Sequence, residues 1–372
     1  MTIIEDMGVI MKKTMIITSI LTLALIFSAC SKTPEAQPME PSETPVETPA
    51  EEPEEEPAET PVEVPVEIKE EHRYEQVAEG LSPISGLPYE GDGKVIMVQM
   101  ENTKKARPHS GLSEASLIYE MEVESTITRL TTFFHGSYPE KAGPVRSTRK
   151  QHMFLWREWN YLYIFFGGSN LKPGQDIYDW MAELDITAKK LDGTKTGKGF
   201  SRSTDRVAPH NAYTNLKEVM ETSYDFEPVN RTLYFDENAV LMGEPAKKIA
   251  LSYSADNNIT YEYQEESGEY RRFINGEPMM DKESDTQIAV RNIIVQHANH
   301  FHVTDTVYTN IDLVGSGAAE YFTDGIMRKG TWERKDAESL TRYYDEEGEE
   351  IAIKPGKTFI QIMRNESQVS FE

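Results

Sequence analysis

The sequence predicts an α/β or α+β N-terminal domain followed by a mostly antiparallel β domain, which would be an open barrel or a sandwich. Three observations lead to this fold class. Strand-like and helix-like patterns alternate between residues 79 and 240. Short strand-like segments separated by turn residues fill residues 241–372. Residues 1–78 lack the apolar pattern of a folded core, so we expect the domains to span residues 79–240 and 241–372.

The first 30 residues have the three parts of a secretory signal peptide. Two lysines precede an apolar run, Met15–Phe27, and two small residues lead from it to Cys30. The run is shorter than the roughly 20 residues that a membrane-spanning helix needs. Met11 is a better start than Met1, because it places the two lysines directly after the initiator. We therefore expect residues 1–30 to act as an export signal.

Cys30 is the only cysteine of the chain, so the folded part has no disulfide bonds. The run Phe27–Cys30 resembles the lipobox of bacterial lipoproteins, although Phe27 stands where an aliphatic residue is usual. The resemblance implies a diacylglyceryl group on the Cys30 thiol, and two acyl chains give stable anchoring. The alternative is a plain signal peptide with an unrelated cysteine. We expect an extracytoplasmic protein that is lipid-anchored to the cell membrane through Cys30.

Residues 31–78 are rich in proline and glutamate, which predicts a disordered tether. Prolines recur every fourth residue from Pro41 to Pro65. Each proline disfavours helix in the residue before it, and the glutamates repel one another. We expect an extended spacer that holds the folded part away from the membrane. The alternative, a proline-rich ligand for another domain, has a single PxxP spacing at Pro38 and Pro41 to support it.

The formal net charge is −25, and it is unevenly distributed. Residues 31–71 carry −12, from fourteen glutamates against two lysines, and residues 72–372 carry −13. An acidic domain repels phosphate backbones, so nucleic acid is not an expected partner.

The first predicted domain contains strands and helices that alternate along the chain. Apolar runs and period-two patterns predict strands over Lys94–Met100, Ala115–Val123, Ile127–Phe134 and Tyr161–Phe166. Helical spacing predicts helices over Ser147–Trp159, Asp176–Leu184 and Asn215–Ser223.

The second predicted domain contains eight short strands without a clear helix. They are Lys248–Tyr253, Ile259–Gln264, Tyr270–Ile274, Gln287–Gln296, Thr306–Leu313, Ala318–Phe322, Leu340–Tyr344 and Lys357–Met363. Turn signals such as Asn275-Gly276 separate several of them, which favours antiparallel pairing.

Several short segments, in order from Ser82 to near the end of the chain, resemble the YerB-like lipoproteins of Gram-positive bacteria. The segments are Ser82–Pro88, Ala106–Leu112, Ile118–Glu120 with Ile127–Arg129, Gly143–Ser147, Gly167–Ser169, Pro209–Asn211, Gly330–Trp332 and Lys354–Thr358. The resemblance implies a two-domain extracytoplasmic lipoprotein and no established reaction.

The main candidate site gathers basic, acidic and histidine residues from these segments, many beside turn-forming proline and glycine. The candidate ligand-binding residues are Arg107, His109, Glu120, Arg129, Arg146, Arg149, His210 and Asn211. Arginine grips carboxylates and phosphates with a planar fork, so we expect one cleft that takes an anionic group. The alternative is structural: Glu120 pairs with Arg129 across a hairpin, and the prolines and glycines shape turns.

Two further clusters have weaker signals. Lys195–Thr204 is basic, glycine-rich and hydroxyl-rich, but it lacks P-loop spacing, and a flexible surface loop is the alternative. On a strand, His300 and His302 share a face, and with His297 or Asp305 they could hold a metal, yet no metal-binding motif accompanies them. We therefore expect no metal and no cofactor.

These observations favour a membrane-anchored binding or scaffolding module of the cell envelope. Its partner would be a cell-wall polymer or another envelope protein. The alternative is an envelope enzyme that acts on peptidoglycan or its precursors through His109 or His210 and Glu120. No nucleophile motif accompanies these residues, so we favour the binding module.

Overall fold

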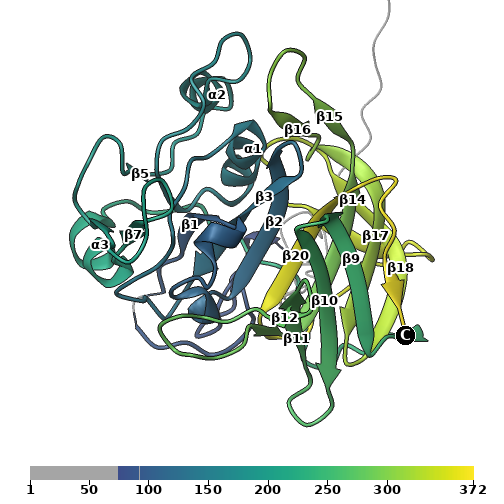
Figure 1. Ribbon diagram of the computed structural model, residues 1–372. Coiled ribbons are helices and arrows are strands. Elements are labelled where there is room, and N and C mark those ends of the chain that lie inside the picture. Colours follow the sequence, from purple (N-terminus) through teal and green to yellow (C-terminus); the bar gives the residue numbers. More distant parts are fainter. Residues whose placement is uncertain (1–73, 92) are drawn as a thin grey trace, which may run out of the picture. The chain divides into compact units, whose positions relative to one another are not determined.

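The computed structural model describes residues 74–91 and 93–372 (Figure 1), and these belong to one compact unit. Cys30, the predicted signal peptide and residues 31–73 of the predicted tether lie outside the described residues. The remaining tether residues, 74–78, belong to the described fold, and Tyr74 is buried. Within the described part of the chain, no helix combines the length and apolar character needed to cross a membrane.

The described strands form a large sheet of eleven strands and a smaller sheet of six. The large sheet runs in the order β19 (Arg342–Asp345), β18 (Ile326–Arg334), β17 (Gly315–Thr323), β14 (Asn292–Ala298), β20 (Thr358–Arg364), β2 (Leu117–Glu124), β3 (Ile127–Phe134), β1 (Ile96–Glu101), β4 (Leu162–Phe165) and β5 (Lys190–Asp192), with β8 (Glu244–Pro245) beside β18. The smaller sheet runs in the order β12 (Glu277–Pro278), β11 (Glu269–Ile274), β10 (Asn257–Gln264), β9 (Lys248–Ser254) and β21 (Ser370–Phe371), with β13 (Ala289–Val290) beside β11.

Strand β20, near the end of the chain, joins the two halves of the large sheet. It pairs in parallel with β2 on one side, where Leu117 lies opposite Thr358, and with β14 on the other. Strands from before residue 240 and strands from after it therefore share one hydrogen-bonded sheet (Figure 1).

Both faces of the large sheet are covered, which accounts for its long apolar strands. Val98 and Met100 of β1 lie in one apolar cluster with Ile249 and Tyr261 of the smaller sheet. Helix α3 (Leu216–Ser223) contributes to the same cluster. On the other face, α1 (Lys150–Trp159) and α2 (Ile177–Glu183) pack into a second cluster that includes Met97.

Two small hairpins and two short 3-10 turns complete the described elements. The hairpins are β6 (Phe200–Arg202) with β7 (Ala212–Thr214), and β15 (His300–His302) with β16 (Thr309–Ile311). The turns are η2 (Lys104–Ala106) and η3 (Leu112–Glu114). The turn η2 follows β1 directly and so lies where the candidate site is built.

The predicted fold class is confirmed. Strands and helices alternate in the first half, mostly antiparallel strands follow, and the described strands form no closed barrel. Strand β18 was not predicted, because Lys329 and Gly330 interrupt its apolar residues and its buried positions include Arg334. The exact domain bounds at residues 79 and 241 stay predictions.

Candidate functional site

Most of the predicted site residues meet at one end of the large sheet, where β1 and β2 end and β3 begins. Because side chains alternate across a strand, they form one polar cluster on each face of the sheet. We call them the Glu101 cluster, on the side of α1, and the Glu120 cluster, on the side of the smaller sheet.

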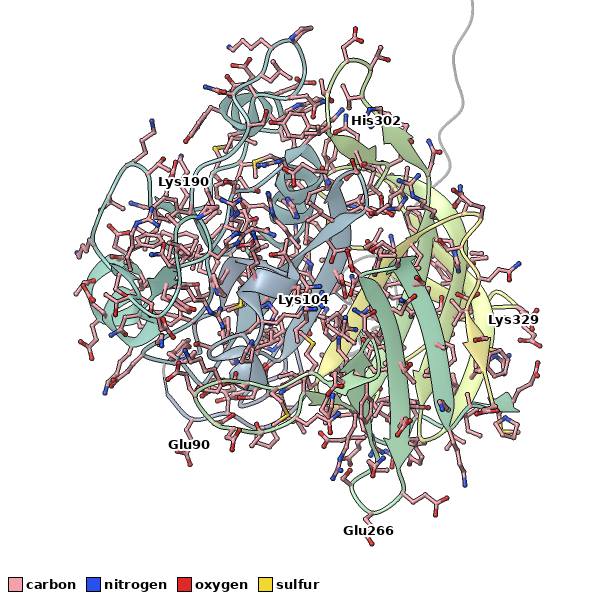
Figure 2. The ribbon with its side chains drawn as sticks, viewed as in Figure 1. Glu90, Lys104, Lys190, Glu266, His302 and Lys329 are labelled. Carbon is pink, nitrogen blue, oxygen red and sulfur yellow. The ribbon has the colours of Figure 1, made fainter. Side chains whose placement is uncertain are left out.

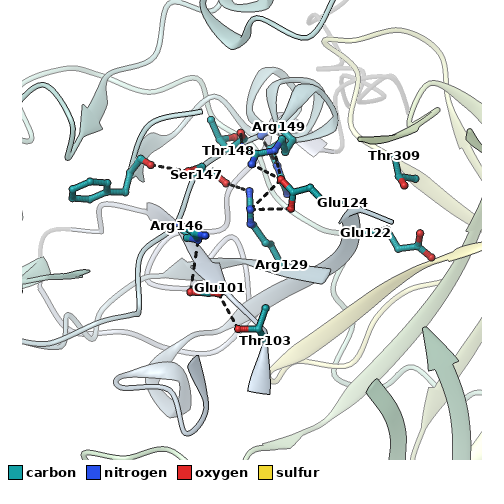
Figure 3. A network of polar contacts seen from close by, with 12 residues as sticks. Glu101, Thr103, Glu122, Glu124, Arg129, Arg146, Ser147, Thr148, Arg149 and Thr309 are labelled. Atoms are coloured by element: carbon teal, nitrogen blue, oxygen red, sulfur yellow. Dashed lines mark hydrogen bonds and ion pairs between the residues drawn. The ribbon is translucent and has the colours of Figure 1, made fainter. Parts of the chain in front are cut away.

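In the Glu101 cluster, the buried carboxylate of Glu101 is the common partner of three side chains. His210 Nδ1 donates to it at 2.8 Å, and Thr103 Oγ1 donates to it at 2.8 Å. Arg146 Nε lies 3.7 Å from the same carboxylate (Figure 3). Glu101, which we did not identify from the sequence, thus brings together His210 and Arg146, two residues that lie far apart in the chain.

Two further arginines lie beside this cluster, around Glu124. Arg129 Nη2 donates to Glu124 Oε2 at 3.0 Å, and Arg149 Nε donates to Glu124 Oε1 at 2.6 Å (Figure 3). Arg129 also donates to the carbonyl oxygen of Ser147. Burial, reinforced by the charge of Arg149, lowers the pKa of Arg129 to about 9, so this residue stays charged at neutral pH.

In the Glu120 cluster, the buried Glu120 carboxylate is fully occupied. Arg272 Nη2 donates to Oε2 at 2.6 Å, and neither side chain is exposed. Oε1 accepts from Asn102 Nδ2 at 2.7 Å, Asn257 Nδ2 at 2.9 Å and Thr128 Oγ1 at 2.7 Å. Such a group stabilises the fold and leaves no oxygen for a ligand.

The ion pair between Glu120 and Arg129 that we considered as an alternative does not form. In the β2–β3 hairpin, Glu120 lies opposite Leu130, while Arg129 lies opposite Met121. The two side chains therefore point to opposite faces of the sheet, and each has another partner.

Arg107 lies at the edge of the Glu120 cluster. Its Nε donates to Asn102 Oδ1 at 3.2 Å, and its Nη2 donates to the Asn102 carbonyl oxygen at 2.6 Å and to Asn257 Oδ1 at 3.3 Å. Burial lowers the pKa of Arg107 to about 10, which leaves it charged at neutral pH. Among the described residues, no group accepts a hydrogen bond from its Nη1.

A pocket of about 420 Å³ opens beside Arg107 and His210. Its lining combines cations, one carboxylate, hydroxyls, amides and one exposed aliphatic side chain: Asn102, Thr103, Lys104, Lys105, Arg107, Thr126, Ile127, Thr128, His210, Ser254, Asp256 and Asn257. Lys104 and Lys105 are exposed and have no ion-pair partner within the described part of the chain. Figure 2 labels Lys104 where the N-terminal strands meet β9 and β10. The pocket is therefore a positive spot on an acidic protein.

Of the eight candidates, Arg107 and His210 line this pocket, and the other six do not: His109, Glu120, Arg129, Arg146, Arg149 and Asn211. His109 is fully buried, and its Nε2 donates to the Glu101 carbonyl oxygen at 2.6 Å. Burial lowers the pKa of His109 to about 4, so the ring is neutral at physiological pH. Asn211 accepts from Arg202 Nη1 at 2.7 Å and donates to the Ser203 carbonyl oxygen at 3.1 Å, which fixes the β6–β7 hairpin. Ligand binding by the eight candidates stays a prediction.

Several residues of the site were not foreseen from the sequence. They are Glu101, Asn102, Thr103, Lys104, Lys105, Thr128 and Asn257. Adjacent lysines directly before the family-like segment at residues 106–112 were a usable signal. Asn257 had none, because it reaches Glu120 from 137 positions along the chain.

The other two clusters are tied into the surrounding structure. In the glycine-rich segment, Lys198 Nζ donates to the Thr222 carbonyl oxygen at 2.9 Å, and residues 200–202 form β6. His297 pairs with Glu320 at 2.8 Å, while His300 and His302 lie on β15. Within the described residues, no group of three or more histidine, cysteine, aspartate or glutamate side chains is arranged to hold a metal ion.

Comparison with known proteins gives consistent matches over the described part of the chain. Residues 84–227 match the N-terminal domain, and residues 249–360 the C-terminal domain, of the family described as "Protein of unknown function (DUF3048)". A curated protein of Bacillus subtilis (strain 168), "Putative lipoprotein YerB", is 26% identical over 296 residues, which cover 76% of this chain and 86% of that protein. The crystal structure of YerB from Bacillus subtilis aligns with a TM-score of 0.68 and 25% identity, covering 78% of this chain and 99% of that one.

Proposed function

The chain belongs to the DUF3048 family of YerB-like proteins, and on this premise we propose that it is an extracytoplasmic lipoprotein that works as a binding module in the cell envelope. The word lipoprotein in the name of its relative supports this, as does the signal-like segment that ends at Cys30. The ligand is an anionic group of a cell-wall polymer or of another envelope protein. It enters the pocket beside Arg107 and His210.

The observation that carries the proposal is a pocket in an acidic chain where three cations outnumber one carboxylate, Asp256. Lys104, Lys105 and Arg107 line one pocket without an ion-pair partner among the described residues, although the chain has a net charge of −25. Elsewhere on the described surface, cations such as Lys247 and Arg328 are paired with carboxylates. Lysines without an ion pair occur there too, but Lys329 lines a hollow that also holds Glu244, Glu346 and Glu347. Cations left without a partner around a hollow are suited to an anion supplied by a ligand.

The shape and lining of the pocket suit a ligand that is more than a bare ion. Ile127 is 44% exposed and lines the pocket, so an apolar part of the ligand can pack there. Thr126 and Ser254 add hydroxyls that donate to or accept from a sugar or peptide group. A binding site with a few polar groups around apolar surface is typical of specific small-ligand recognition.

A second candidate function is acid–base catalysis by His210. The specific observation in its favour is that Glu101 holds His210 Nδ1, an arrangement that also orients catalytic histidines. Glu120, which we first considered for this role, is unsuitable because four donors occupy its carboxylate. Binding remains the proposal, because the described pocket presents no activated nucleophile beside His210.

Co-sedimentation with insoluble cell walls tests the binding proposal. The mature chain would be produced with Cys30→Ala so that it is soluble, and retention would be compared with the double variant Lys104→Glu/Lys105→Glu. We expect about tenfold weaker retention for the double variant, and weaker salt dependence, because two attractive charges become repulsive.

The matched control is Lys190→Glu/Lys329→Glu. Both lysines are exposed and lie away from Lys104 in Figure 2. Walls stripped of phosphate polymer with hydrofluoric acid distinguish a phosphate ligand from a carboxylate ligand. Equal retention of the pocket variant and the control variant would contradict the proposed function. Mass spectrometry of the native protein tests the anchor separately: an acyl group on Cys30 is expected, and its absence would refute the lipoprotein proposal.

A further inference from the structure

Asn257 is a buried polar residue at the start of β10 that reaches into the other half of the protein. It is 4% exposed. Its Nδ2 donates to Glu120 Oε1 at 2.9 Å and to Thr128 Oγ1 at 3.1 Å. A side chain from the smaller sheet thus takes part in a polar cluster built on β2 and β3.

Asn102 makes the same contacts from the end of β1. Its Nδ2 donates to Glu120 Oε1 at 2.7 Å and to Thr128 Oγ1 at 2.9 Å. An ionised carboxylate only accepts hydrogen bonds, so it fixes which end of each amide faces it. Both amide nitrogens therefore face Glu120, and both amide oxygens are turned away from it.

The two amide oxygens converge on Arg107. Asn102 Oδ1 accepts from Nε at 3.2 Å, and Asn257 Oδ1 accepts from Nη2 at 3.3 Å. Turning either amide over would place its oxygen against the Glu120 carboxylate and its nitrogen against a cation. The Asn102 carbonyl oxygen, which accepts from Nη2 at 2.6 Å, anchors the guanidinium. The two amide oxygens, held by the carboxylate, then fix the rotation of the guanidinium plane.

Glu120 is itself held in place. Arg272, from β11 of the smaller sheet, donates to its other oxygen at 2.6 Å with both side chains fully buried. Arg272 thus holds Glu120, Glu120 orients the two asparagines, and the asparagines orient Arg107 at the pocket.

We infer that Asn257 is a positioning residue for Arg107, and that Asn102 and Asn257 transmit the direction of the buried Glu120 carboxylate to the guanidinium that meets the ligand. This inference rests on the proposed function, because it assigns the ligand contact to Arg107. No described residue accepts a hydrogen bond from Arg107 Nη1. Because this nitrogen is a charged donor, the ligand group that meets it is an oxyanion. The pocket is complete only when the smaller sheet is docked, because Asn257 and Arg272 both belong to it.

The experiment compares Asn257→Ala with Asn258→Ala, which removes the neighbouring, exposed asparagine. The mature chain with Cys30→Ala is titrated with inorganic phosphate and, separately, with acetate, and melting temperature is recorded for each variant. Asn257→Ala should weaken binding of the preferred anion about tenfold, because a hydrogen bond to a charged group is lost. Asn258→Ala should bind as the parent chain does.

A double-variant cycle with Arg107→Ala separates positioning from an independent contact. If Asn257 acts through Arg107, adding Asn257→Ala to Arg107→Ala weakens binding no further. Additive losses would overturn the inference while leaving the proposed function intact.

A second readout does not depend on any ligand. In the free protein, nitrogen NMR should show a slowly exchanging Arg107 Nη2–H signal, from the proton that Asn257 Oδ1 accepts, in the parent chain and in Asn258→Ala, and its loss in Asn257→Ala. If neither anion binds the parent chain, the pocket is not the ligand site, and the proposed function is wrong. The NMR signal still tests whether Asn257 positions Arg107. An unchanged signal in Asn257→Ala would refute it.

Discussion

His210 Nδ1 donates a hydrogen bond to the Glu101 carboxylate at 2.8 Å, across 109 positions of sequence. The contact joins the loop that precedes β7 to the end of β1, and it determines which ring nitrogen is left over. Because Nδ1 carries the donated proton, Nε2 of the neutral ring is an acceptor and that of the charged ring is a donor. The side chain is 19% exposed and lines the pocket, so this nitrogen is the part of His210 that a ligand can meet.

Arg146 does not line the pocket but pairs with Glu101, the partner of His210, so Arg146→Ala tests whether the ligand extends to it. We expect wall binding roughly ten- to a hundredfold weaker, with the fold intact. The Arg146 side chain is 28% exposed, and its one ion pair, with Glu101, is long at 3.7 Å, so we expect a stability change below about 1 kcal/mol. A partly buried contact between arginine and an anion is worth about 1.5–3 kcal/mol. Co-sedimentation and urea unfolding measure the two effects. Arg271→Ala, an exposed arginine on β11, is the control, and equal binding by both variants would exclude Arg146 from the site.

Arg272→Ala should destabilise the protein strongly. The change leaves the Glu120 carboxylate buried without its charged partner, which costs about 3–5 kcal/mol. Lys247→Ala removes one partner of an exposed pair with Glu265 and should leave the free energy of unfolding almost unchanged. Urea titrations of both variants test these expectations. If Arg272→Ala left the free energy of unfolding almost unchanged, water would have replaced the guanidinium beside Glu120, and the prediction would be wrong.

Removal of residues 31–71 should leave the melting temperature of the mature chain unchanged, whereas a chain that begins at residue 79 should be clearly less stable. The difference arises at Tyr74, which is buried, donates to Glu350 and has its carbonyl oxygen bonded to Thr232 N at 2.9 Å. Loss of a buried aromatic side chain costs about 3 kcal/mol. Thermal unfolding of chains starting at residues 31, 72 and 79 tests this. A lower melting temperature for the chain starting at 72 than for the one starting at 31 would contradict the tether prediction.

Acidification should destabilise the protein partly through His109. Burial lowers the pKa of His109 from 6.5 to about 4, so the unfolded chain binds a proton in this window and the folded chain does not. Stability is therefore full above pH 6.5 and falls as the pH drops toward 4. Between pH 7 and 5 the loss is about 2 kcal/mol. His109→Gln should reduce the slope of stability against pH by about one proton, as urea unfolding at several pH values can measure. An unchanged slope would show that the ring is protonated in the folded state.

The secondary structure of the first half could be predicted closely, because its strands are apolar and its helices have clear spacing. The predicted strand over residues 127–134 coincides with β3, and the three predicted helices each differ from α1, α2 and α3 by a few residues at most. Strand β18 escaped prediction because Lys329, Gly330 and the buried Arg334 break its apolar alternation.

The candidate site was predictable in its location more than in its roles. Turn-forming residues flank Arg107, Arg146 and His210, and the structure brings these three residues to one end of the sheet. Burial depends on contacts between distant segments, so the sequence could not reveal that His109 and Glu120 are fully enclosed. Glu101 lies at the end of an apolar strand and has no local feature that marks it as the shared partner.

The position of β20 in the large sheet has a consequence for the order of folding. This strand, Thr358–Arg364, follows every other described strand of the large sheet in the chain, yet it lies between β14 and β2 and joins the two parts of the sheet. The strands made before it cannot complete the large sheet until it has been synthesised. Such non-local pairing delays folding. For the exported lipoprotein that we propose, this delay favours passage across the membrane before the sheet is complete.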